Sequence, residues 1–104
     1  MQGYRRALQA PGYLRVPIHY RNKFKKNLEL MIRRGKDVEK IKAVIVCLVN
    51  GVPLEPRHKD HPLVGNFVGF RDCHIEPDWL LIYRIEDDTL YLERTGTHSD
   101  LFKR

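Results

Sequence analysis

The chain has 104 residues, of which 42% are hydrophobic and 31% are charged. This length suits one domain with a single core, and these proportions are those of an ordinary globular protein. The longest apolar run, AVIVCLV at residues 43–49, falls well short of the roughly 18 residues that a membrane-spanning helix needs. The first residues carry arginines but no apolar signal-peptide segment, so we expect a cytoplasmic protein without a membrane partner.

The formal net charge of +6 is concentrated in the first part of the chain. Residues 1–42 carry 12 Lys and Arg against 3 Asp and Glu, a balance of +9, whereas residues 43–104 carry 7 against 10, a balance of −3. A basic surface so short of acids favours a polyanionic partner, first nucleic acid and second an acidic protein segment, over an ordinary solvated helix face. The residues expected to form it are Arg21, Lys23, Lys25, Lys26, Arg33, Arg34 and Lys36.

Residues 15–51 predict one strand and two helices. Arg15–Tyr20 can form a first strand, which Pro17 would restrict to the edge of a sheet. Two apolar stripes at helical spacing follow, separated by Gly35, and Asp37 can cap the second helix before Gly51 ends it. We therefore expect a helical hairpin. Its apolar positions are Phe24, Leu28, Met31 and Ile32 in the first helix and Val38, Ile41, Ile45, Leu48 and Val49 in the second.

Residues 52–65 contain three prolines and follow neither period, so we expect a long polar loop. Three strands are predicted after it, at Phe67–Ile75, Trp79–Glu86 and Leu90–Thr95. Short turns at residues 76–78 and 87–88 would connect them as an antiparallel meander. Together these elements predict an α+β fold in which the helices pack on one face of the sheet and the opposite face stays available. We assign residues 15–104 to this single domain and residues 1–14 to an N-terminal tail.

The histidines gather in the second half of the chain, where four of the five lie beside turns or strand ends. Period-two alternation in the first strand of the meander places Asp72 and His74 on one face together with Phe70. The same alternation points Arg71, Cys73 and Ile75 the other way. The loop adds further polar side chains, the turn adds one and the closing segment adds one: His58, Asp60, His61, Asp78 and His98.

Several imidazoles and carboxylates beside a basic surface, with no serine-nucleophile motif and no phosphate-binding glycine loop, suit RNA cleavage by transesterification. The 2′-hydroxyl of the substrate is then the nucleophile, so the protein supplies only a base, an acid and charge stabilisation. Histidine suits the first two roles because its unperturbed pKa is about 6.5. In the closing segment, Thr97 and Asp100 have the form of a helix capping box, which predicts a short C-terminal helix with His98 in its first turn.

Four ordered blocks carry a family resemblance: KDHPL, FRDCHIEPDW, LIYRI and ERTGTHSDLF, between Lys59 and Phe102. With the basic helical hairpin before them, they make the chain resemble the YafQ branch of the RelE/ParE superfamily of bacterial type II toxin–antitoxin toxins, over residues 15–102. The resemblance implies a small RelE-like fold and a ribosome-dependent mRNA interferase, an endoribonuclease that cleaves mRNA in the A site of the 70S ribosome. It also implies a cognate DinJ-like antitoxin as partner in a hetero-oligomer.

The family's site residues transfer to matching positions of this sequence. The resemblance implies an endoribonuclease site made of His61, Asp72, His74, Asp78, His98 and Phe102. By analogy, His98 would be the general acid, and His61 or His74 would act as base or hold the phosphate. Asp72 and Asp78 would orient the imidazoles, while Phe102 would pack against a base or hold the closing segment. Arg94 could neutralise the phosphate, but strand alternation places it with Leu90 and Leu92.

Other interpretations remain open. A zinc site at the histidines lacks recognised ligand spacing, so we expect neither a metal nor another cofactor. The two cysteines fall in an apolar run and a strand and are expected to be buried thiols. A ParE-like toxin that acts on DNA gyrase would have no use for His61, His74 and His98 together. An RNA-binding module without catalysis would explain the charge but calls for exposed aromatic residues, whereas most Tyr and Phe here fall at core positions.

Overall fold

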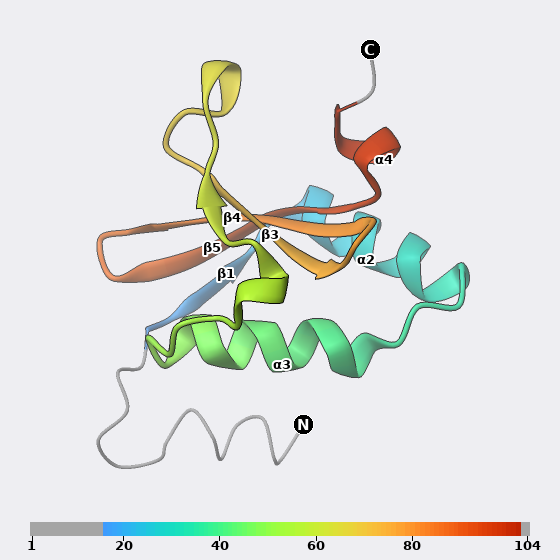
Figure 1. Cartoon of the computed structure of the whole chain (residues 1–104), viewed down its shortest axis with the longest axis horizontal. Coiled ribbons are helices and arrows are strands. Elements are labelled where there is room, and N and C mark those ends of the chain that lie inside the picture. Colours follow the sequence, from blue (N-terminus) through green and yellow to red (C-terminus); the bar gives the residue numbers. More distant parts are fainter. Residues whose placement is uncertain (1–15, 103–104) are drawn as a thin grey trace.

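The computed structural model describes residues 16–102, so the predicted tail at residues 1–14 and the first residue of the predicted strand, Arg15, lie outside the described residues. A five-stranded sheet forms the centre of the fold, with the strand order β1-β5-β4-β3-β2 (Figure 1). β1 (Ile18–Tyr20) is the expected edge strand, although the prediction was wrong to include Val16 and Pro17, and it pairs in parallel with β5. The predicted antiparallel meander is confirmed as β3 (Arg71–Glu76), β4 (Trp79–Glu86) and β5 (Thr89–Gly96).

The loop predicted over residues 52–65 is more ordered than expected. It contains the short 3-10 turn η1 (Pro56–His58) and the strand β2 (His61–Pro62), and the turn η2 (Gly65–Phe67) follows. β2 pairs antiparallel with β3, with His61 opposite Asp72. β3 itself begins at Arg71, so the prediction of a strand from Phe67 was wrong at its start, because residues 65–67 form η2 instead.

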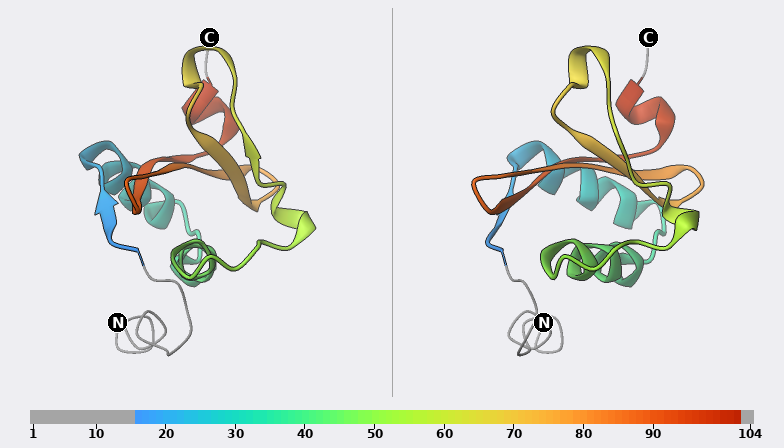
Figure 2. Two further views of the ribbon diagram at one scale, coloured as in Figure 1. Left: turned by 90° about the vertical axis from the view of Figure 1, so that its left-hand side faces the viewer. Right: turned by 60° about the vertical axis from the view of Figure 1, so that its left-hand side comes forward.

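Two helices cover one face of the sheet, as predicted: α2 (Asn22–Arg33) and α3 (Val38–Val49) (Figure 2). Asp37 caps α3, because its carboxylate accepts a hydrogen bond of 2.9 Å from the backbone N–H of Glu39. The stripe predicted for α2 is wrong at Ile32, which is 46% exposed. At 3.6 residues per turn, Ile32 lies about 80° around the helix from Phe24 and so points away from the core. No helix within residues 16–102 is long and apolar enough to cross a membrane.

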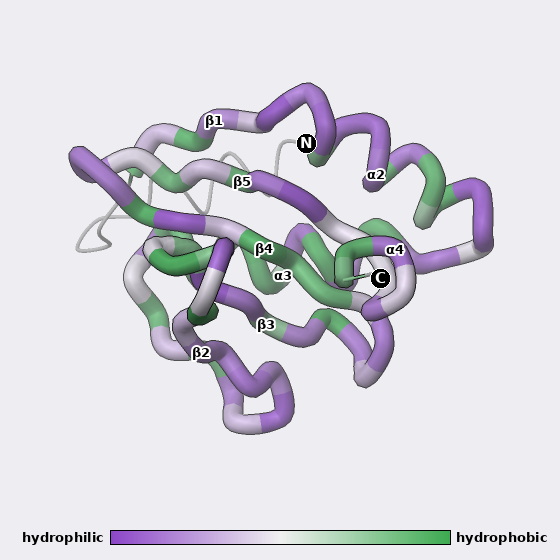
Figure 3. The backbone as a smooth tube through the Cα atoms, turned by 90° about the horizontal axis from the view of Figure 1, so that it is seen from above, coloured by the Kyte–Doolittle hydropathy of each residue, from purple (hydrophilic) through white to green (hydrophobic). Residues whose placement is uncertain are grey.

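The sheet has an apolar cluster on each face. The larger one joins α2 and α3 to the sheet around Trp79, whose indole N–H donates to the Thr95 hydroxyl over 2.9 Å. The smaller one lies on the opposite face, where Leu101 of α4 (His98–Phe102) packs on Leu80 and Ile82. The face expected to stay available is therefore partly covered by α4 and by the β2–β3 connection, both visible on that side in Figure 2. Figure 3 shows β4 as largely hydrophobic and much of α2 as hydrophilic.

A β-bulge reverses the alternation within β5. Ile82 pairs with Arg94 and the next residue, Tyr83, pairs with Leu92, so Glu93 is an extra residue in β5. Such an insertion turns the following side chain to the other face of the sheet. The prediction that Arg94 shares a face with Leu90 and Leu92 was therefore wrong, and Arg94 lies on the face of Ile82.

Candidate active site

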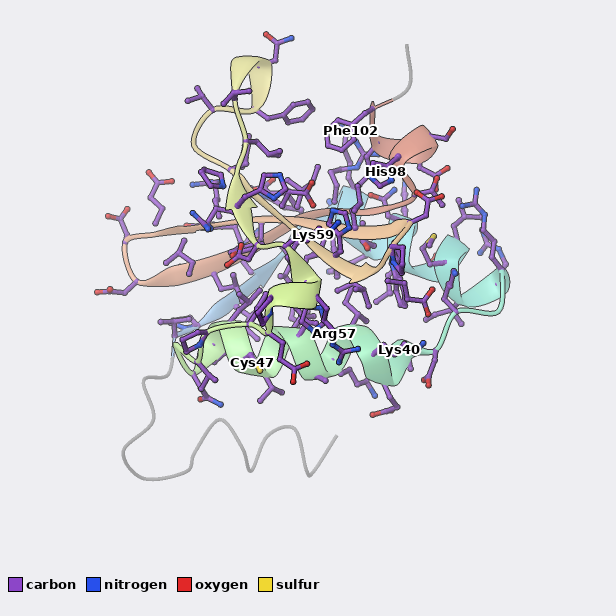
Figure 4. The ribbon with its side chains drawn as sticks, viewed as in Figure 1. Lys40, Cys47, Arg57, Lys59, His98 and Phe102 are labelled. Carbon is purple, nitrogen blue, oxygen red and sulfur yellow. The ribbon has the colours of Figure 1, made fainter. Side chains whose placement is uncertain are left out.

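The six predicted site residues come together on the face of the sheet that carries α4. Across the strands, His61 lies beside Asp72, Asp72 beside Ile82, and His74 beside Leu80. Asp78, in the β3–β4 turn, contacts His98 at the start of α4. His98 and Phe102 are labelled on this side in Figure 4, opposite the side on which α3 carries Lys40 and Cys47.

His98 is held by Asp78 through two hydrogen bonds to the same oxygen. Oδ1 of Asp78 accepts from the backbone N–H of His98 over 2.9 Å and pairs with its ring Nδ1 at 2.6 Å. The bond from the His98 backbone N–H, followed by the bond from its ring, lowers the pKa of the Asp78 carboxyl, which keeps it ionised near neutral pH. A carboxylate partner at Nδ1 places a proton there and leaves Nε2 of His98 directed elsewhere. Because the His98 side chain is 55% exposed, Nε2 is accessible to a substrate.

A reciprocal capping box fixes the helix that carries His98, as the sequence predicts. The N–H of Thr97 donates to the Asp100 carboxylate over 3.0 Å, and the N–H of Asp100 donates to the Thr97 hydroxyl over 3.1 Å. Arg34, at the end of α2, makes a two-pronged ion pair with Asp100, at 2.7 and 3.3 Å. The guanidinium and the Thr97 backbone N–H lower the pKa of Asp100 to about 2. This Arg34–Asp100 ion pair, called the clamp below, therefore connects α2 to the helix of His98.

His74 supplies a second imidazole with different electrostatics. Its ring centroid lies 5.7 Å from that of His98, and the two rings meet edge to face. Burial lowers the pKa of His74, although the nearby Asp72 carboxylate opposes the effect. The backbone of His74 is fixed by His58, which lies outside the predicted site and whose Nδ1 donates to the His74 carbonyl over 2.6 Å. His58 is itself buried, so its ring holds η1 against β3.

Asp72 is the buried acid of the site, with 5% of the residue exposed. Burial raises the pKa of its carboxyl, and the neighbouring His61 and His74 oppose that rise. Its Oδ2 lies 3.9 Å from Nε2 of His61, while its buried Oδ1 has no hydrogen-bond partner within residues 16–102. Nδ1 of His61 donates to the carbonyl of Lys59 over 2.6 Å, so Nε2 is the nitrogen directed towards Asp72. Asp72 thus has an unused acceptor beside two imidazoles.

Phe102 is half-buried at the end of α4. It packs against the smaller apolar cluster, and its ring meets that of Phe67, in η2, edge to face at 5.6 Å between centroids. Phe102 therefore links the helix of His98 to the β2–β3 connection.

The eight basic residues predicted to bind RNA or the ribosome divide into two groups. Four make contacts within the protein: Arg21 with Glu93, Arg34 with Asp100, Lys36 with Glu76, and Arg94 with Asn27. The other four, all in α2, have no ion pair with any residue in the described range: Lys23, Lys25, Lys26 and Arg33. Among residues 16–42, the exposed surface of α2 is therefore the main source of uncompensated positive charge.

The titratable side chains of the site suit acid–base catalysis. One imidazole is oriented by an exposed carboxylate, and a second has its pKa lowered by burial. Within residues 16–102, no group of three or more His, Cys, Asp and Glu side chains is arranged to hold a metal ion. Both cysteines are free thiols. Cys73 is buried as predicted, whereas Cys47 is only half-buried, so that prediction was wrong for Cys47.

Comparisons with known proteins identify relatives of this fold and site. The sequence model of a family described as "Bacterial toxin of type II toxin-antitoxin system, YafQ" matches residues 16–103. The mRNA interferase toxin YafQ of Escherichia coli K12 is 46% identical over 86 residues, which cover 82% of this chain and 94% of that protein.

Solved structures with the same fold point to the same family as the sequence comparisons. In the crystal structure of the E. coli DinJ–YafQ complex, the matching chain is 45% identical, with a TM-score of 0.79, covering 85% of this chain and 99% of that one. A metal-bound toxin from Helicobacter pylori is 42% identical, with a TM-score of 0.79, covering 84% of this chain and 99% of that one. The fold is thus a small RelE-like fold of the kind found in bacterial toxins. The chain belongs to the YafQ family of type II toxin–antitoxin toxins.

Proposed function

We propose that this toxin is an endoribonuclease of the mRNA interferase type, which cleaves mRNA in the A site of the 70S ribosome. The observation that supports this most strongly is the pair of imidazoles, His98 held by Asp78 and His74 with a lowered pKa, 5.7 Å apart on one exposed face. The E. coli relative, which bears the name mRNA interferase toxin, supports the same activity.

In the proposed reaction, the 2′-hydroxyl of the substrate attacks the adjacent phosphorus atom. The imidazole of His74 takes the hydroxyl proton, since a lowered pKa keeps this ring neutral and able to accept it near pH 7. As the bond from phosphorus to the 5′-oxygen breaks, Nε2 of protonated His98 donates a proton to that oxygen. The products are a 2′,3′-cyclic phosphate and a free 5′-hydroxyl.

The remaining site residues have supporting roles in this proposal. Asp78 orients His98 and stabilises its protonated ring through the 2.6 Å contact at Nδ1. His61, whose side chain is about half exposed, holds the phosphate, and Asp72 orients His61 and His74 from beneath. Arg94 lies on the same face of the sheet and offers positive charge to the pentavalent transition state. Phe102 positions the closing helix.

The surroundings of the site define the proposed partners. The uncompensated cations Lys23, Lys25, Lys26 and Arg33 on α2 suit contacts with ribosomal RNA and mRNA phosphates. We also propose a DinJ-like antitoxin as the inhibitory partner in a hetero-oligomer, since a YafQ relative forms such a complex in E. coli. Action on translating ribosomes would place the protein in the cytoplasm.

Primer extension on an mRNA translated in vitro tests the proposed activity. We expect His98→Gln to reduce cleavage by roughly 10²- to 10⁴-fold, the usual contribution of a general acid or base. His19→Gln is the matched control, because it makes the same substitution at a histidine of β1, outside the histidine cluster. Omitting ribosomes tests the ribosome dependence. In-frame cuts that persist in His98→Gln would contradict the proposal, and gyrase inhibition would then be the activity to measure.

A further inference from the structure

A cavity of about 330 Å³ lies on the active-site face of the sheet, next to the proposed catalytic residues. Its floor includes Ile82, which pairs with Asp72 on one side and with Arg94 on the other. Asp72 and Arg94 are thus two strand spacings apart, about 10 Å. The cavity wall includes Phe67, which contacts Phe102 of α4. The cavity therefore lies between the predicted site and the start of α2, on the same face of the sheet.

The lining of this cavity combines aromatic and cationic side chains. Phe67 and Phe70 form an aromatic wall, with ring centroids 6.4 Å apart and an edge-to-face arrangement. Both rings are only half-buried, contrary to the expectation that most Tyr and Phe fall at core positions. The guanidinium of Arg84 lies 6.0 Å from the centre of the Phe70 ring, so Phe67 offers the less covered surface. An apolar surface of this kind beside a phosphodiester site suits a nucleobase, because every base has a flat face that stacks on aromatic rings.

The rim of the cavity carries more positive than negative charge. Arg21 is offset by Glu93, the acid of the lining, through an ion pair of 3.4 Å. Lys23 has no ion pair within the described part of the chain, and Arg94 contacts only the neutral amide oxygen of Asn27, over 2.7 Å. Lys23 and Arg94 therefore keep their full charge beside the aromatic wall. The first turn of α2 borders the same rim and adds the positive end of its dipole.

This combination of aromatic and cationic side chains favours a nucleotide over an acidic peptide as the ligand of the cavity. Two uncompensated cations would attract either one, but an acidic side chain leaves the aromatic wall unused, whereas a nucleotide brings a flat apolar base together with a phosphate. The β-bulge at Glu93 is what makes the arrangement, because it turns Arg94 onto the face of Phe70 and Ile82.

We propose that this cavity is a base-binding subsite for the nucleotide adjacent to the cleaved phosphate. The base of that nucleotide stacks on Phe67 and Phe70, and Lys23 and Arg94 hold the phosphate of the nucleotide. The inference rests on the proposed endoribonuclease function and adds the position of a substrate nucleotide to it. Phe67 then has two contacts, one with the base and one with Phe102, so base binding also supports the helix that carries His98.

A fluorescence experiment tests the subsite separately from cleavage. Short mRNA oligonucleotides with 2-aminopurine at one A-site position are bound to 70S ribosomes and titrated with the His98→Gln protein, whose strongly reduced cleavage leaves the RNA intact during the measurement. Stacking of 2-aminopurine on an aromatic ring quenches its fluorescence, so one oligonucleotide position should show quenching. Removing one stacking ring, by Phe67→Leu or Phe70→Leu, should abolish the quenching and raise Kd by about fivefold or more.

Val64→Ala is the matched control, since Val64 belongs to the same β2–β3 connection and is 81% exposed but does not line the cavity. Its quenching and Kd should equal those of the parent protein, and thermal melts confirm that each variant is folded. Equal quenching in all variants, or none in the parent, would overturn the subsite even if the wild-type protein cleaves mRNA. The subsite would also be overturned if the Phe67 and Phe70 variants lost affinity for an acidic antitoxin peptide but kept their affinity for RNA. Quenching that depends on Phe67, found without any cleavage activity, would support the subsite and refute the proposed function.

Discussion

The Arg34–Asp100 clamp is expected to hold the helix of His98 in place, and Asp100→Asn tests this. The change removes a two-pronged ion pair and weakens the bond from the Thr97 backbone N–H. Loss of a helix cap costs about 1 kcal/mol, which is the upper limit for the weakened Thr97 bond, and a partly exposed ion pair contributes roughly 0.2–1 kcal/mol. We therefore expect Asp100→Asn to lower the free energy of unfolding at pH 7 by about 1–2 kcal/mol.

The pKa of Asp100 gives an independent limit on this magnitude. A value of about 2 in the folded protein, against an ordinary 3.8, corresponds to at most about 2–3 kcal/mol. The 41% exposure of the Arg34 side chain reduces that figure through solvent screening. Because the folded pKa is lowered, the contribution is fully present above pH 4 and is lost as the pH falls towards 2. The difference between wild type and Asp100→Asn should therefore shrink over this range.

Thermal unfolding and mRNA cleavage are the two measurements. A loss of 1–2 kcal/mol corresponds to a decrease in Tm of roughly 4–15 °C for a domain of this size. Glu55→Gln is the control, because the Glu55–Arg57 ion pair has a contact of similar length, 2.8 Å against 2.7 Å, but at least 70% of each side chain is exposed. We expect that control to stay within about 0.5 kcal/mol of wild type. A Tm and a cleavage rate for Asp100→Asn equal to those of Glu55→Gln would refute the role of the clamp.

Three further changes address the imidazoles and their supports. Asp78→Asn should slow cleavage by about tenfold or more in single-turnover assays while leaving Tm nearly unchanged, since the amide no longer stabilises protonated His98; an unchanged rate would contradict this orientation. Because the pKa of His74 is lowered, we expect the cleavage rate of the wild type to decrease with falling pH only below pH 6.5. His58→Phe, which loses the hydrogen bond to the His74 carbonyl, should change this pH profile as well as the rate. A Cβ added at Gly96 would lie 2.9 Å from the Cβ of the aspartate in α4, so Gly96→Ala should cost about 1–3 kcal/mol and reduce cleavage, and a variant of wild-type stability would show that α4 shifts freely.

Local signals in the sequence were sufficient for most of the secondary structure. The Asp37 cap and the Thr97–Asp100 capping box depend on residues two to three positions apart, and both form as predicted. The turn at residues 87–88 also forms, with both aspartates at positive φ, as a tight hairpin turn requires. Alternation along β3 correctly placed Asp72 and His74 on one face, since no bulge interrupts the strand between them.

The six site positions were transferred from a family resemblance, and the structure brings them to one face. Composition and spacing alone predicted that histidines and carboxylates gather in the second half, that Asp72 and His74 share a face, and that this set suits RNA cleavage, but they did not select the six positions. Their roles stay predictions, because a list of positions contains neither the 2.6 Å contact that orients His98 nor the burial that lowers the pKa of His74.

Only the tertiary structure decided where the charged side chains go. One extra residue, Glu93, reverses the alternation of β5 and brings Arg94 to the site, and a period-two pattern contains no sign of such an insertion. Arg34 was expected to bind RNA with its neighbours in α2, yet it pairs with Asp100, 66 positions later in the chain. A helix pattern determines which residues face the core, but the partner of an exposed cation depends on which distant segment the fold places beside it.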